Sequence, residues 1–93
     1  MKKTSERASE KLRVILANSL FNATKVMQKE KVDKDVMAKS IAVCEKYLQE
    51  AVSYVKNLES KCLTYCNLIS IGKKRYMRNV ESALNEIGEQ EHD

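Results

Sequence analysis

Apolar residues recur in alternating steps of four and three through the middle of the sequence. We call these ten positions the heptad seam, and they are Met37, Ile41, Cys44, Leu48, Ala51, Val55, Leu58, Cys62, Tyr65 and Ile69. This spacing is typical of a helix that buries one apolar stripe against other helices. It predicts a single helix over residues 34–70, which would be about 55 Å long at 1.5 Å per residue.

The composition favours helix for the rest of the chain as well. The 93 residues contain no proline and only two glycines, Gly72 and Gly88. A sandwich or barrel needs a turn signal every 8 to 12 residues, so an all-β fold is excluded. With 43% apolar and 32% charged residues, the chain is typical of an ordinary folded domain rather than a disordered segment. We therefore expect one all-α domain over residues 1–93.

Two further helices are predicted beside the central one. Residues 5–31 carry apolar side chains at helical spacing, and Asp33 is a good N-cap for the helix that follows, so the first two helices should run antiparallel. The apolar register shifts beside Gly72, which indicates either a turn or a kink there. With a turn, the third helix covers residues 73–87, ends at Gly88 and leaves an acidic tail over 89–93. The expected fold is an antiparallel hairpin or three-helix bundle with coiled-coil-like packing.

A second apolar flank lies beside the heptad seam. Val43, Tyr47 and Tyr54 follow one another at helical spacing, and tyrosines in such positions often anchor protein interfaces. They mark a candidate partner-binding surface, unless another helix of the chain covers them. A 55 Å helix with two apolar faces is also more than the remaining residues can cover, so we expect a homodimer joined along the heptad seam.

A basic cluster near the third helix carries the alternative hypothesis. Lys73, Lys74, Arg75 and Arg78 lie within six residues of each other, beside Tyr76. Such a cluster can contact nucleic-acid phosphates or an acidic protein, although a solvated helix face has the same composition. The net charge of +4 is modest, and five acidic residues follow the cluster after residue 80.

Residues suited to catalysis or metal binding are few. The chain has three cysteines, Cys44, Cys62 and Cys66, and one histidine, His92. Cys44 lies too far from the other two along a helix to complete a zinc site, and His92 is next to the last residue. We predict no metal, no cofactor and no enzymatic activity. An odd number of cysteines favours the cytoplasm, and no apolar stretch is long enough to span a membrane.

These observations predict a non-enzymatic helical protein-interaction module. Small helical proteins of this type serve as adaptors, chaperones or inhibitors of the immunity-protein kind, but that is analogy of architecture. The heptad seam predicts self-association, and the partner is a protein of unknown identity. The alternative function is a nucleic-acid-binding accessory protein that uses Lys73 to Arg78.

Overall fold

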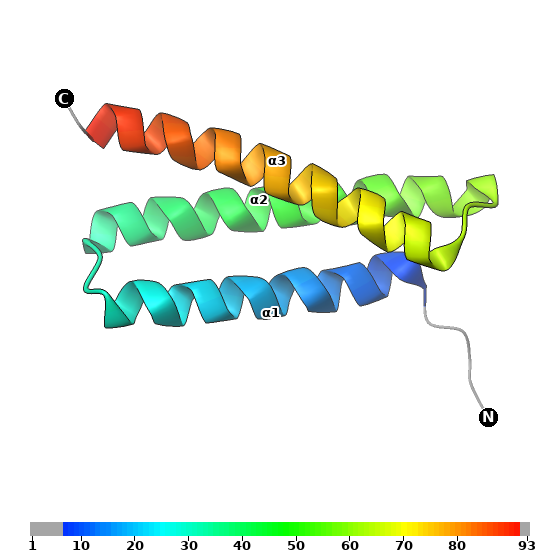
Figure 1. The fold of residues 1–93 in the computed structure, drawn as a ribbon, viewed down its shortest axis with the longest axis horizontal. Coiled ribbons are helices and arrows are strands. Elements are labelled where there is room, and N and C mark those ends of the chain that lie inside the picture. The colour runs from blue at the N-terminus through cyan, green and yellow to red at the C-terminus, as the bar shows by residue number, and fades with distance from the viewer. Residues whose placement is uncertain (1–6, 92–93) are drawn as a thin grey trace.

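The chain folds into three packed helices, as a computed structural model shows (Figure 1). The structure describes residues 7–91, with side chains up to residue 88. Helix α1 covers Ala8–Lys29, α2 covers Lys34–Leu58 and α3 covers Tyr65–Glu91, with a short 3₁₀ helix, η1, over Glu59–Lys61. No strand occurs within these residues, so the prediction of an all-α, three-helix fold is confirmed. Over the same residues, none of the helices has the length and apolarity that crossing a bilayer requires.

The turn between α1 and α2 is short, as predicted. Helix α1 ends two residues before Lys31, whose φ of 58° reverses the chain. Asp33 caps α2: its carboxylate accepts hydrogen bonds from the backbone N–H of Asp35 at 2.9 Å and of Val36 at 3.4 Å. The side chain thereby satisfies two of the amides that a helix start leaves without partners. Helices α1 and α2 therefore run antiparallel (Figure 1).

Helix α2 ends at Leu58, so the prediction of one helix over residues 34–70 is wrong. After η1, Cys62 adopts a left-handed conformation with φ of 61°, and the chain turns into α3. Thr64 then starts the new helix, because its hydroxyl oxygen accepts a hydrogen bond from the Asn67 N–H at 3.3 Å. The 25 residues of α2 span about 37 Å rather than 55 Å. The length on which the homodimer prediction was based is therefore not present.

Helix α3 passes through both glycines without a turn. It begins at Tyr65 rather than at residue 73, continues unbroken over residues 70–76 and extends past Gly88 to Glu91. Gly72 is buried, and a Cβ atom placed on it would collide with Leu12 Cδ2 and lie 2.8 Å from Val55 Cγ2. Leu12 and Val55 are fully buried. Gly72 thus lets α3 pack closely against both α1 and α2, and it does not mark the predicted turn.

Apolar residues four apart explain how α3 crosses the others. On α1, one row of residues four apart contributes most of the core, namely Ala8, Leu12, Leu16 and Leu20. On α3, the corresponding row consists of Leu68, Gly72, Tyr76, Val80 and Leu84. Ridges of residues four apart are typical of helices that cross obliquely, whereas a coiled coil keeps its helices nearly parallel. Figure 1 shows the result: α3 lies close to the start of α1 and diverges from it toward its own C-terminal end.

The divergence divides the molecule into two parts. We call one the closed half, made of residues 8–16, 44–58 and 65–80, and the other the open half, made of residues 17–29, 34–43 and 81–88. All buried side chains of the described residues belong to the closed half. In the open half α2 lies between α1 and α3 (Figure 1), and its apolar side chains are only half-buried or exposed.

Candidate interaction surface

Helices α2 and α3 bring together two residues that the sequence presented as members of separate sites. Tyr54 lies on α2 and Arg75 on α3, and the guanidinium carbon of Arg75 is 4.3 Å from the centroid of the Tyr54 ring. This distance is that of a cation–π contact, which holds both side chains at the surface. The Tyr54 side chain keeps 38% of its area exposed to solvent. The pair therefore offers an aromatic edge and a cation from two different helices.

Two hollows adjoin this pair, and Tyr54 and Arg75 line both of them. The first, of about 250 Å³, is lined by Tyr54, Ile71, Lys74, Arg75, Arg78 and Asn79, which include three cations and no carboxylate. The second, of about 490 Å³, is lined by Lys46, Gln49, Glu50, Ser53, Tyr54, Asn57 and Arg75. We call Tyr54, Lys46, Lys74, Arg75 and Arg78 the Tyr54–Arg75 surface. It carries four positive charges around one tyrosine, with Glu50 at its edge.

The predicted basic cluster divides between two sides of α3. Lys74, Arg75 and Arg78 line the first hollow, whereas Lys73 is exposed and lines neither of the two. Lys46 was not expected in this surface. Its position depends on where α2 ends and α3 turns back, so no local pattern in the sequence places it beside Arg75. The same reason explains why the contact between Tyr54 and Arg75 was not predicted.

The structure places the three residues of the predicted tyrosine surface in different surroundings. Tyr47 is half-buried and packs against the core, with Lys46 Nζ 5.4 Å from its ring centroid. Val43 is half-buried on the same helix. Of the three residues, Tyr54 is the one that lines the two hollows beside Arg75, so it is the residue of this group that we keep in the candidate site.

The heptad seam lies mainly inside the chain. Its members fall into four groups: Cys44, Ala51 and Val55 are buried; Leu48, Leu58 and Ile69 pack against the core; Met37 and Ile41 are half-buried in the open half; Cys62 and Tyr65 are exposed. Over residues 44–58 the seam is thus satisfied within one chain. Self-association through the seam therefore stays a prediction for its exposed and half-buried members alone.

The three cysteines have different surroundings. Cys44 is buried beside Tyr76, whereas Cys62 and Cys66 are exposed at the turn before α3 and in its first turn. Burial raises the pKa of Tyr76 well above its ordinary range, and a hydrogen bond with Cys44 adds to the increase. This pair therefore belongs to the core. Among the described side chains, those of residues 7–88, no three His, Cys, Asp or Glu residues cluster as metal ligands, and His92 lies outside them.

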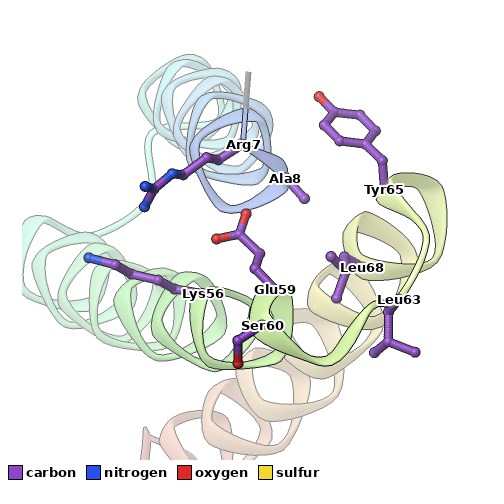
Figure 2. Close-up of a pocket in the computed structure, with 8 residues that line it drawn as sticks. All are labelled: Arg7, Ala8, Lys56, Glu59, Ser60, Leu63, Tyr65 and Leu68. Atoms are coloured by element: carbon purple, nitrogen blue, oxygen red, sulfur yellow. The ribbon is translucent and has the colours of Figure 1, made fainter. Parts of the chain in front are cut away.

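A third hollow, of about 500 Å³, lies where η1 meets the start of α1. Figure 2 shows Glu59 pointing from η1 toward this helix end. Its carboxylate accepts a hydrogen bond from the Ser9 N–H at 3.0 Å and one from the Ser9 hydroxyl at 3.2 Å. Arg7, the N-cap residue of α1, makes no side-chain capping bond, so Glu59 supplies the cap from 50 residues away. The hollow thus holds a structural contact that sequence reasoning missed.

Comparisons with known protein families, with curated proteins and with solved structures found no match to this chain. The functional argument therefore depends on the surfaces described above.

Proposed function

We propose that the chain is a non-enzymatic protein-interaction module that forms a homodimer and binds an acidic segment of a partner protein on the Tyr54–Arg75 surface. The observation that carries the proposal is the contact between Tyr54 and Arg75, with Lys74 and Arg78 in the adjoining hollow. Tyrosine and arginine are the residues most enriched among those that dominate interface energies. Here they lie together, exposed and oriented by two packed helices.

The charge of the surface favours an acidic partner. The hollow beside Ile71 contains three cations and no carboxylate, so these cations have no acidic neighbour among the residues that line it. Arginine binds carboxylates with two parallel hydrogen bonds, which adds geometric selectivity to the charge attraction. The Tyr54 ring beside them supplies apolar contact area at low cost in conformational entropy. A peptide with two or three carboxylates near an apolar side chain matches this set.

Nucleic acid is the second candidate for the same surface. A tyrosine beside arginines can stack on an unpaired base while the cations contact phosphates. One feature favours the acidic protein: the cations of this surface cover a short patch on two helices, which suits a short acidic segment. On the described part of α3, Glu81 and Glu86 follow these cations, so the patch does not continue along the helix as a long positive stripe.

The homodimer and the cytoplasmic location are part of the same proposal. Half-exposed apolar side chains in the open half support association, because large exposed apolar patches are typical of interaction sites. Cys44, Cys62 and Cys66 form no disulfide bond, which suits a reducing compartment.

Fluorescence anisotropy with two labelled probes tests the binding proposal. The first probe is a 20-residue acidic peptide in which leucines are interspersed among glutamates. The second is a 20-nucleotide single-stranded DNA. We expect the full chain to bind the peptide more tightly, and Arg75→Gln together with Tyr54→Ala to weaken peptide binding by about tenfold or more, as for interface hot spots. Circular dichroism of the variant checks that its helicity is unchanged.

A charge-matched control separates this surface from general attraction. The variant Lys11→Gln, Lys34→Gln, Lys61→Gln loses three exposed cations that line neither hollow of the Tyr54–Arg75 surface. The matched test variant is Lys74→Gln, Arg75→Gln, Arg78→Gln. If both lower peptide affinity equally, the surface has no specific role and the proposal fails. If the test variant weakens only DNA binding, the second candidate replaces the first.

A further inference from the structure

Helix α1 carries a second set of apolar side chains, on the side that faces away from the other two helices. It lies along one edge of the molecule (Figure 1). Val14 is two residues after the buried Leu12 and Phe21 is nine residues after it, about two and a half turns, so both lie opposite Leu12. Val14 is 49% exposed and Phe21 is 59% exposed, so the other described helices leave both accessible.

Two residues of opposite charge extend this side of α1. Glu10 lies one turn before Val14 and Lys25 lies one turn after Phe21, and both are exposed. Lys25 Nζ is 4.6 Å from the centroid of the Phe21 ring, so the cation and the ring share one side of the helix. We call the exposed set the α1 outer stripe, and its members are Glu10, Val14, Ala17, Asn18, Phe21 and Lys25.

The α1 outer stripe is complementary to its own reverse. Val14 and Phe21 are equally far from the midpoint between Ala17 and Asn18, and so are Glu10 and Lys25. Two copies of α1 that pair antiparallel about this midpoint bring Val14 of each copy against Phe21 of the other. Glu10 of each copy then meets Lys25 of the other, once at each end. The small side chain of Ala17 at the centre lets the two helices approach.

We propose that the α1 outer stripe binds the same stripe of a second copy of this chain, with the two α1 helices antiparallel. The inference rests on the homodimer proposed above and assigns its interface to a surface separate from the Tyr54–Arg75 surface. A two-fold axis perpendicular to α1 produces the pairing, and such an interface closes with two copies. Each copy supplies both members of the apolar contact and both members of the ion pair, which favours a second copy over a foreign protein.

The charges distinguish this pairing from the parallel one. A two-fold axis along α1 would place Glu10 against Glu10 and Lys25 against Lys25, and such like-charge contacts suppress association. Lys11, which is exposed at the margin of the stripe, lies near Lys25 of the other copy in the antiparallel pair and opposes it. We therefore expect Lys11→Gln to strengthen the dimer by about twofold.

Charge exchange tests the pairing by sedimentation equilibrium of the full chain. Glu10→Lys makes both ends of the interface basic, and Lys25→Glu makes both ends acidic. We expect the unaltered chain to dimerise with a dissociation constant of about 100 μM or below, and each variant alone to associate about tenfold more weakly. An equimolar mixture of the two variants should regain dimer, since opposite charges meet again at both ends. Recovery in the mixture also shows that each variant is folded.

Two exposed valines on α1 provide a matched second test. Val14 belongs to the α1 outer stripe, whereas Val26, 58% exposed, is nearly four turns after Leu12 and so lies on the opposite side of the helix. We expect Val14→Glu to weaken the dimer at least tenfold and Val26→Glu to change it less than twofold. Circular dichroism checks that both variants keep their helicity.

Cysteine cross-linking tests the direction of the pairing, in a chain that also carries Cys62→Ser and Cys66→Ser. Ala17→Cys places one thiol of each copy beside the two-fold axis, whereas Gln28→Cys places the two thiols about 30 Å apart along the paired helices. Oxidation with diamide should cross-link the Ala17→Cys chain into a covalent dimer and leave the Gln28→Cys chain uncoupled. Equal cross-linking of both refutes the antiparallel arrangement.

The outcomes separate this inference from the rest of the proposal. A monomer at all concentrations refutes the homodimer and its interface together. A dimer that neither Val14→Glu nor the charge variants weaken keeps the homodimer but refutes the α1 outer stripe. Acidic-peptide binding at the Tyr54–Arg75 surface is measured independently and does not depend on either result.

Discussion

The closed and open halves differ in burial although the same three helices form both. In the closed half Gly72 lets α3 approach Leu12 and Val55, and the core there is buried on every side. In the open half the equivalent sides of the helices bear Val26, at 58% exposure, and the half-buried Met37. Apolar periodicity is thus present along the whole length, but an oblique crossing buries it at one end only. We infer that the closed half holds most of the folding stability and that the open half is available for association.

Leucine truncation on α1 should give the largest difference between the halves. Leu12 is fully buried, whereas Leu20, two turns further along the same row, is half-buried. We expect Leu12→Ala to lower the free energy of unfolding by about 2–5 kcal/mol, because it removes buried contacts and leaves a cavity. Leu20→Ala should lower it by roughly 1 kcal/mol, since less area is lost from the core.

Urea denaturation followed by circular dichroism at one fixed protein concentration measures both variants. The fixed concentration matters because association adds to the apparent stability of the folded chain. Equal losses for the two leucines would show that the open half is as well packed as the closed half, and would contradict the division.

Alanine at the two glycines should change stability in opposite directions. At Gly72 the added methyl group meets Leu12 and Val55, and overpacking of this kind costs about 1–3 kcal/mol. Alanine's better helix propensity offsets up to about 1 kcal/mol of that loss. At Gly88 no atom lies within 4 Å of the new Cβ, so Gly88→Ala should stabilise the chain by up to about 1 kcal/mol.

Thermal unfolding of the two alanine variants beside the unaltered chain measures this contrast. The direction in which Gly72→Ala shifts the midpoint temperature is the more decisive of the two results. If Gly72→Ala raised the midpoint temperature as Gly88→Ala should, α3 would not be in close contact with Leu12 and Val55 at the crossing, and the role given to Gly72 there would be wrong.

The contrast between the halves also explains what sequence reasoning reached and what it missed. The helical class and the cap at Asp33 depend on near neighbours in the chain, and both were predicted. Two local signals disagree about where α2 ends. The heptad seam continues to Ile69 and predicts one helix, whereas Thr64 caps a new helix. Apolar spacing is unchanged by a turn whose length keeps the register, so the seam did not reveal the break.

Contacts between distant parts of the chain were beyond prediction for a different reason. The closeness of Tyr54 to Arg75, and of Gly72 to Leu12, follows from where the chain turns and how the helices cross. An error of several residues in the turn moves the start of α3 from Tyr65 to residue 73 and brings different side chains beside α2. Lys46 entered the candidate surface only through this geometry.

The smallest of the expected effects concerns the cap that joins η1 to α1 in the closed half. Glu59 accepts two hydrogen bonds from Ser9, at the positive end of the α1 dipole, where a carboxylate is stabilising. Glu59→Gln keeps the shape of the side chain and one acceptor oxygen but removes the charge, so we expect a loss of about 1 kcal/mol in the free energy of unfolding. Glu45→Gln is the control, because Glu45 is exposed on α2 and its substitution should stay within about 0.5 kcal/mol. Amide hydrogen exchange locates the effect: faster exchange confined to the first turn of α1 supports the capping role. If exchange in that turn were unchanged in Glu59→Gln, another group would have to satisfy the Ser9 amide, and the capping role given to the Glu59 charge would be wrong.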